Sequence, residues 1–199
     1  MVIKLIHQIW VGPNKMPDVC VNYIKQIKEL HPDYEHRLWT DEDLTEENFS
    51  NLEYIKSTPI YAQKADIMRY EILYKHGGIY LDTDFEIFKP LTPLLTHDLV
   101  VCNEDWHVDL YMTNAFIYSI PGTENFKNCI DNIKHCILGG QVCVAKHTGP
   151  WYFRSKISLA RARVLPSAVM YPIHFTYDGK YPESYSPETY GCHHWHKSW

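Results

Sequence analysis

Residues 64–84 read KADIMRYEILYKHGGIYLDTD, and this stretch decides the fold. It predicts a helix that ends at two consecutive glycines, followed at once by a short buried strand. Two carboxylates, Asp82 and Asp84, stand directly after the strand. Because open α/β sheets bind their ligands at the carboxyl ends of strands, we expect the functional site at this acidic pair.

Strands and helices alternate outward from this stretch. β-branched apolar runs predict strands, and apolar residues three or four positions apart predict helices. The predicted strands cover residues 2–11, 35–39, 79–81, 85–88, 99–102 and 113–119, and the predicted helices cover 18–30, 60–76 and 124–138. The alternation becomes less regular towards the end, which indicates an α/β fold with a mixed, mostly parallel sheet flanked by helices.

The composition is that of a folded globular protein. The chain has 199 residues, of which 45% are hydrophobic and 22% are charged. This length favours a single domain over residues 1–199, which a longer polypeptide could also contain. The formal net charge of −5 gives no electrostatic support to a nucleic-acid partner.

Targeting signals are missing from the sequence. No apolar run approaches the ~18 residues of a membrane-spanning helix, and the first residues lack the cleavage site of a signal peptide. We therefore expect a cytoplasmic protein without a membrane span. The six cysteines include no C-x-x-C pair, which predicts free thiols rather than disulfides or a zinc site.

The acidic pair is the clearest chemical signal. In an extended chain residues i and i+2 point to the same side, so Asp82 and Asp84 can offer two carboxylates to one hard cation. A solvated acidic turn is the ordinary explanation of a bare D-x-D. Here, however, the apolar residues before the pair predict a buried strand that leads up to it, which favours a ligand-binding site. An EF-hand is excluded because Ile87 and Pro93 stand where its loop needs Gly and Glu.

Two other functions remain open at this point. A phosphatase would use Asp82 as its nucleophile and Asp84 as its general acid, although Glu86 stands where such enzymes prefer Thr or Val. A non-catalytic nucleotide-sugar or glycan-binding module would keep aromatic and cationic contacts without needing the acidic pair. The G-x-G-x-x-G, P-loop and H-E-x-x-H motifs are absent, which excludes Rossmann dehydrogenases, P-loop NTPases and zincins.

Four motifs resemble one known family. The stretch at 64–84 is similar to the signature of the DXD-motif sugar transferases of glycosyltransferase family 32, whose distant relatives include the glucosylating domains of clostridial toxins. Supporting matches are IHQIWVG at 6–12, TGP at 148–150 and HHWHKSW at 193–199. Together these motifs extend over nearly the whole chain.

The resemblance implies a single GT-A domain and a metal-dependent, retaining glycosyltransferase. Such enzymes move a sugar from a nucleotide-sugar donor, here a UDP-sugar in preference to a GDP-sugar, to a hydroxyl of a glycan or glycoprotein acceptor. Their cofactor is Mn²⁺ or Mg²⁺, which an acidic domain needs to neutralise a diphosphate leaving group. The family includes virus-encoded members as short as this chain, for which the expected location is the host cytoplasm.

By the same resemblance, the acidic pair binds the metal. Asp84 is expected as a direct ligand, and Asp82 as a contact through water or through the ribose of the donor. Asp66 and Arg69 are expected to hydrogen-bond the donor sugar, although two such residues three apart on a helix also make an ordinary surface ion pair. Tyr80 is expected either to contact the donor or to pack in the core.

Residues elsewhere complete the predicted donor and acceptor site. Trp10 would stack on the nucleotide base, with His7 and Gln8 beside it, unless these side chains serve the core and nearby backbone groups. Asn114 has the amide chemistry to bind acceptor or donor hydroxyls, and capping is the alternative role.

The end of the chain supplies the last predicted residues. His193 matches the histidine that completes the metal shell in related GT-A proteins, and Lys197 would reach the diphosphate. Ser198 and Trp199 would close over the donor as a lid. We expect this ending to act only with donor and metal bound, so that a chain ending at Tyr190 keeps its fold.

Overall fold

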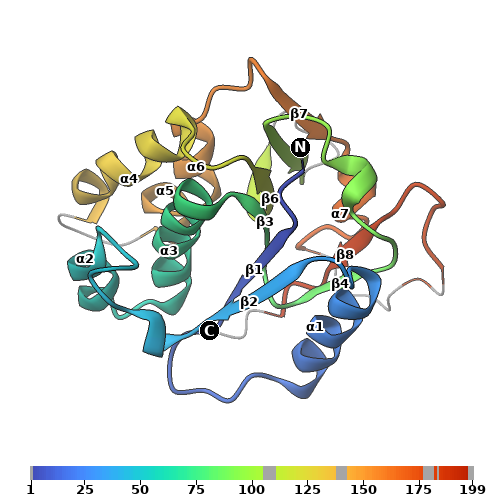
Figure 1. Cartoon of the computed structure of the whole chain (residues 1–199), viewed down its shortest axis with the longest axis horizontal. Coiled ribbons are helices and arrows are strands. Elements are labelled where there is room, and N and C mark those ends of the chain that lie inside the picture. Colours follow the sequence, from blue (N-terminus) through green and yellow to red (C-terminus); the bar gives the residue numbers. More distant parts are fainter. Residues whose placement is uncertain (1, 105–110, 138–142, 177–181, 183, 197–199) are drawn as a thin grey trace.

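The computed structural model describes residues 2–104, 111–137, 143–176, 182 and 184–196 (Figure 1). In this part of the chain a six-stranded sheet lies between layers of helices, with a two-stranded sheet beside it. The strands are β1 (Leu5–Ile9), β2 (Glu35–Trp39), β3 (Gly78–Leu81), β4 (Phe85–Ile87), β5 (Leu99–Asn103), β6 (Met112–Ser119), β7 (Ala162–Leu165) and β8 (Gly191–His193). The α-helices are α1 (Asp18–Leu30), α2 (Leu52–Ser57), α3 (Tyr61–His76), α4 (Glu124–Ile137), α5 (Val144–His147), α6 (Pro150–Lys156) and α7 (Ser167–Met170).

The large sheet is mixed, with the strand order β2-β1-β3-β6-β5-β7. β1 is parallel to both β2 and β3, and β7 is parallel to β5. β6 is antiparallel to its neighbours β3 and β5. The prediction of a mixed, mostly parallel sheet is therefore confirmed. Since β6 runs against β3, the beginning of β6 lies beside the carboxyl end of β3.

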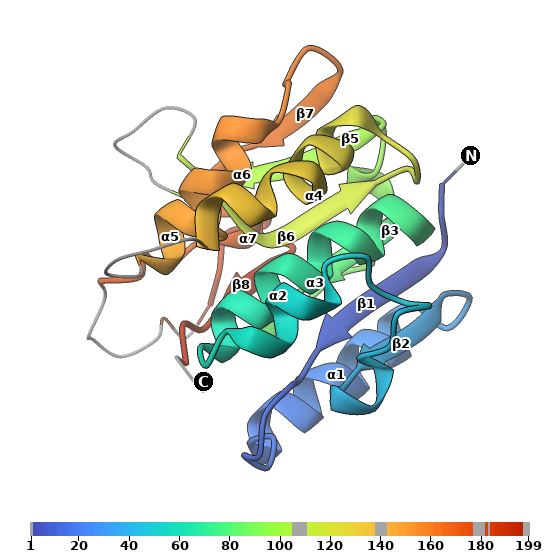
Figure 2. The ribbon, with the colours of Figure 1, turned by 90° about the vertical axis from the view of Figure 1, so that its left-hand side faces the viewer.

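Two apolar cores hold the sheet between its helices. One face packs against α3, α4 and α6, and the other packs against α1, α7 and β4 (Figures 1 and 2). Because side chains alternate along a strand, Tyr80 points into the first core while Ile79 and Leu81 point into the second. β3 is thus buried on both faces, and its end can hold polar groups away from bulk water.

Two glycines make the sharp turn from α3 into β3. Gly77 and Gly78 have φ values of +64° and +94°, which side-chain-bearing residues rarely adopt. A Cβ atom on Gly78 would also lie 2.5 Å from the carbonyl oxygen of Leu5 on the neighbouring strand. Glycine is therefore required here for the chain to pass directly from helix to buried strand.

Every predicted strand and helix is present, with ends that differ by at most three residues. The strands and α-helices that the sequence pattern did not predict are α2, α5, α6, α7, β7 and β8, none longer than seven residues. Such short elements carry too few residues for a hydrophobic period to be recognised. Free thiols are confirmed for all six cysteines, of which Cys143 is exposed. No helix in the described ranges is long and apolar enough to cross a membrane.

Candidate active site

The acidic pair lies where β3 meets β6 and the ribbon of β4 and β8. The backbone N–H of Asp82 donates to the carbonyl of Ala115 on β6, at 3.0 Å. A tight turn then leads into β4, with the N–H of Phe85 donating to the carbonyl of Asp82 at 3.3 Å. Asp84 lies in this turn, and both carboxylates are half-buried. The turn therefore presents the two side chains at the carboxyl end of β3, as the sequence predicted.

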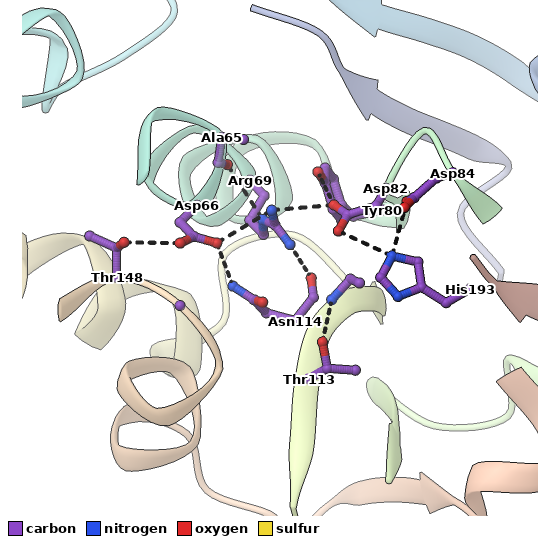
Figure 3. Close-up of polar contacts among 12 residues, drawn as sticks. Ala65, Asp66, Arg69, Tyr80, Asp82, Asp84, Thr113, Asn114, Thr148 and His193 are labelled. Atoms are coloured by element: carbon purple, nitrogen blue, oxygen red, sulfur yellow. Dashed lines mark hydrogen bonds and ion pairs between the residues drawn. The ribbon is translucent and has the colours of Figure 1, made fainter. Parts of the chain in front are cut away.

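β8 brings His193 to the acidic pair from 110 residues further along the chain (Figure 3). β8 pairs with β4 so that His193 stands opposite Phe85. The Nε2 atom of His193 lies 2.9 Å from Oδ1 of Asp84 and 3.7 Å from Oδ2 of Asp82. One ligand atom from each of the three side chains lies within 4.8 Å of the others, which is a spacing that suits a single metal ion.

The charges of this cluster compensate one another. Burial alone would raise the pKa of Asp84, but His193 and the backbone N–H of His196 hold it well below its ordinary value. Burial alone would lower the pKa of His193, but Asp84 and Asp82 outweigh it and raise the pKa. A positive charge is thus favoured between the two carboxylates, and a divalent cation can supply it in place of the proton. Two carboxylate oxygens and one imidazole nitrogen form a donor set that a divalent cation can use.

Arg69, on α3, is paired with the acidic cluster. Its Nη2 atom lies 3.3 Å from Oδ1 of Asp82 and 3.3 Å from Oδ1 of Asp66, and its Nη1 donates to the carbonyl of Asn114 at 2.5 Å. The guanidinium carbon lies 4.4 Å from the centre of the Tyr80 ring. Only 3% of Arg69 is exposed, so this cation is paired inside the protein rather than at its surface.

Asp66 is the second acid that Arg69 holds. It also accepts hydrogen bonds from Nδ2 of Asn114 at 2.7 Å and from the hydroxyl of Thr148 at 2.9 Å. Burial raises the pKa of Asp66 to about 6, although Arg69 and the two hydrogen bonds oppose the increase. Because Asp66 is buried and fully engaged in the chain without a ligand, its predicted contact with the donor sugar remains a prediction.

Tyr80 and Gln8 lie on the two strands that lead to the site. The hydroxyl of Tyr80 donates to Oδ1 of Asp82 at 2.7 Å, which leaves Oδ2 on the side of His193. This arrangement suits Asp84 as the more direct metal ligand. Gln8 is 3% exposed, and its Nε2 has no hydrogen-bond partner among the described residues.

His7 and Trp10 occupy different environments, although both belong to the first motif. His7 is buried in the α3 core, where its Nε2 lies 3.0 Å from the carbonyl of Gly77 and its Nδ1 accepts from the indole of Trp39. The structure therefore does not bring His7 to the acidic pair. Trp10 follows β1 and is only half-buried, with its indole N–H donating to the carbonyl of Asn14 at 2.8 Å. Its predicted stacking on the nucleotide base remains a prediction.

The residues just before the expected lid of Ser198 and Trp199 belong to the folded core. His193 and His194 are 5% and 8% exposed, and β8 is hydrogen-bonded to β4, so these residues belong to the fold. A chain ending at Tyr190 would lose this paired strand, which counts against the expectation that such a chain keeps its fold. Lys197, Ser198 and Trp199 lie outside the described residues, and their predicted roles remain predictions.

Thr148 and Tyr70 are site-supporting residues that were not among the predicted ones. Tyr70 donates to the carbonyl of Thr148 at 2.5 Å and accepts from Nδ2 of Asn114 at 3.0 Å. Thr148, just before α6, therefore holds Asp66 directly, while Tyr70, on α3 itself, holds its partners Asn114 and Thr148. The motif TGP at 148–150 was the available signal, but nothing in its pattern indicated a contact with a helix 80 residues earlier.

The sequence around this site is similar to that of known proteins. Residues 17–101 match a family described as the glycosyltransferase sugar-binding region containing the DXD motif. The resemblance to the DXD-motif sugar transferases is confirmed. Inositol phosphoceramide mannosyltransferase 3 of Schizosaccharomyces pombe is 45% identical over 98 residues, which are 46% of this chain and 27% of the relative. Asp82 and Asp84 are the two acids of the DXD motif in this family region.

Solved structures share the fold of the DXD transferases. The PaToxG glycosyltransferase has a TM-score of 0.67 at 19% identity, over 78% of this chain and 68% of that one. The UDP-bound glycosyltransferase domain of the YGT toxin has a TM-score of 0.57 at 10% identity, over 82% and 79% of the two chains. These similarities confirm the predicted GT-A fold. The chain spans between about a quarter and two fifths of the length of the curated relatives it matches.

Proposed function

We propose that this protein is a metal-dependent glycosyltransferase that moves a sugar from a nucleotide-sugar donor to an acceptor hydroxyl. The observation that carries the proposal is the cluster of Asp82, Asp84 and His193 at the carboxyl end of β3. The family match covers this motif, and the relatives are named for glycosyl transfer. The resemblance to family 32 adds retention at the anomeric carbon.

Each group of the site has a role in this proposal. Asp82, Asp84 and His193 would hold Mn²⁺ or Mg²⁺, which supplies the positive charge that a diphosphate leaving group needs. Arg69 fixes the orientation of Asp82 through its 3.3 Å ion pair and keeps Oδ2 directed at His193. Asp66 would accept from a hydroxyl of the donor sugar once Arg69 or Asn114 releases one of its oxygens.

The donor and the acceptor are proposed from different observations. UDP is the first nucleotide to test, because the YGT toxin domain of similar fold is described as UDP-bound. The acceptor is a glycan or glycoprotein hydroxyl, and the name of the relative from S. pombe makes an inositol phosphate lipid the competing acceptor. We place the reaction in the cytoplasm.

Metal and donor together should stabilise the fold. A ligand present at ~100 times its Kd raises the free energy of unfolding by roughly 2.7 kcal/mol, so a UDP-sugar with Mn²⁺ should raise the melting temperature by several degrees. The same UDP-sugar with EDTA should give a much smaller shift. Thermal denaturation with a panel of UDP-sugars and GDP-mannose measures both effects. Equal shifts with Mn²⁺ and with EDTA would contradict the proposed role of Asp82 and Asp84.

Trp10 should contribute to donor affinity without taking part in the chemistry. Base stacking on an aromatic ring is worth about 1–3 kcal/mol, so Trp10→Ala should weaken donor binding by that amount. KM for the donor should rise more than kcat falls. Trp10→Phe is the matched control, because it keeps a stacking surface and should retain most of the affinity. Unchanged donor affinity in Trp10→Ala would remove Trp10 from the binding site.

The two alternative functions differ from this proposal in their products. A phosphatase would release inorganic phosphate from a phosphomonoester, whereas a sugar transferase releases a nucleoside diphosphate. A binding module would bind the donor and release neither product. Product analysis by chromatography after incubation with UDP-sugar and Mn²⁺ separates the three.

A further inference from the structure

Trp151 is a large aromatic side chain left exposed at the start of α6. The described part of the chain buries most of its large apolar residues, yet 46% of Trp151 is exposed. It follows Pro150 in the first turn of the helix. An exposed indole offers a flat apolar face on which the ring of a ligand can stack.

The indole ring of Trp151 is held in a fixed orientation. Its Nε1–H donates to the hydroxyl of Tyr111 at 3.0 Å, across 40 residues of sequence. The ammonium of Lys146 lies 5.3 Å from the centre of the ring, and Lys146 itself is exposed. We call these three residues the aromatic platform. A ring that is anchored and exposed loses little conformational entropy when a ligand stacks on it.

The aromatic platform is tied to the candidate active site from both of its sides. Tyr111 stands three residues before Asn114, and Trp151 stands three residues after Thr148. Both Asn114 and Thr148 donate hydrogen bonds to Asp66. Three residues span at most roughly 10 Å, so the platform lies within the length of one or two sugar rings from the Asp66 network.

The platform and Trp10 flank the acidic pair on opposite sides. Trp10 follows β1 and Tyr111 precedes β6, while β3, which carries the pair, lies between these two strands. A transferase needs a donor on one side of the reacting bond and an acceptor on the other. With the nucleotide on the β1 side, the β6 side is the one left for the acceptor.

We propose that Trp151, Tyr111 and Lys146 form the acceptor subsite, and that they bind a ring polyol carrying an anionic substituent. This inference rests on the proposed function. The apolar face of a pyranose or cyclitol ring would stack on the indole, as amphipathic ligands do on Trp. The hydroxyl of Tyr111 accepts from the indole and can donate to a ring oxygen. Lys146 supplies the cation for a phosphate or carboxylate, which a chain of net charge −5 otherwise repels.

The test uses the full chain with Mn²⁺, a UDP-sugar or GDP-mannose, and two soluble acceptor probes. Glycerophosphoinositol is the anionic probe, and myo-inositol is its neutral counterpart. Trp151→Ala should raise KM for both probes by roughly 10-fold or more, which is the scale of one aromatic stacking contact. Lys146→Ala should raise KM for glycerophosphoinositol only. Slow hydrolysis of the donor by water should proceed at the unmodified rate in both variants.

Controls separate this inference from the proposed function. Leu38→Ala removes another exposed apolar side chain, on the edge strand β2, and should leave KM unchanged. If Trp151→Ala lowers the melting temperature, Tyr111→Phe is the variant to use instead. Tyr111→Phe removes only the hydroxyl that accepts from the indole, and it should raise KM by a smaller factor. Normal donor hydrolysis with an unchanged KM for the acceptor in these variants would overturn the proposed acceptor subsite and leave the proposed function intact.

Two further outcomes are decisive. Failure of the unmodified chain to glycosylate either probe while it hydrolyses the donor would overturn the proposed acceptor class. Absence of donor binding and donor hydrolysis in the unmodified chain would instead count against the proposed function. The acceptor subsite, which rests on that function, would then be overturned as well.

Discussion

Asp84→Asn should reduce sugar transfer by roughly 1000-fold or more while the protein stays folded. The substitution removes one negative charge from the cluster with Asp82 and His193 but almost no volume. Loss of a single electrostatic contact to developing charge costs about 100–1000-fold in kcat, and here the cation that neutralises the leaving group is lost too. The carbonyl of residue 84 still accepts from the N–H of His194, so the turn should keep its shape.

The measurement is release of nucleoside diphosphate with and without acceptor. Both transfer and slow donor hydrolysis should disappear, because both need the same charge stabilisation. Glu86→Gln is the matched control, because Glu86 lies two residues further along and its carboxylate contacts His194 at 3.0 Å rather than the candidate metal site. Transfer by Asp84→Asn at more than a tenth of the unmodified rate would show that the metal is held elsewhere.

Arg69→Met should destabilise the fold by about 3–5 kcal/mol, the cost of removing one partner from a buried ion pair. The side chain is 4% exposed and lies 3.3 Å from carboxylates of both Asp66 and Asp82. Met fills much of the volume but leaves the two acids without their cation. The ionised form of Asp66 should be destabilised most by the loss of Arg69, because burial already raises the pKa of this carboxyl.

Urea denaturation followed by circular dichroism measures this loss. Lys127→Met is the control, because Lys127 makes an exposed pair with Asp131 on α4 and its loss should leave the free energy of unfolding nearly unchanged. Adding Asp66→Asn to Arg69→Met should restore part of the stability, since one unpaired charge disappears. A loss below about 1 kcal/mol would mean that water reaches Arg69 and screens it.

The sequence alone predicted the central part of the fold for a local reason. A helix, two glycines, three apolar residues and the pair Asp82 and Asp84 follow one another without interruption, so neighbouring residues determine each step. The positive φ of Gly77 and Gly78 shows why no other residue type serves at this turn. The strand that ends in the acidic pair, and therefore the position of the pair, required no knowledge of distant contacts.

His193 shows a more limited kind of prediction. Its predicted role as a metal ligand came from the resemblance of the last motif to a family, and no periodicity indicated that residues 191–193 form a strand. That strand exists because β4 offers it unpaired backbone groups, which are nearly 110 residues away in the sequence. Pairing with a distant partner leaves no local pattern in three residues.

The sequence by itself thus determined the α/β class, the DXD motif and the end of the strand on which it lies. Only the tertiary structure decided that β6 runs against β3, and this reversal places Asn114 beside Asp66 and brings the hydroxyl of Tyr111 within hydrogen-bond distance of Trp151. It also decided that Arg69 is buried between two acids rather than exposed in an ordinary helix pair. The physical reason is that strand order and burial depend on which surfaces pack together, and packing sums many weak contacts between residues far apart in the chain.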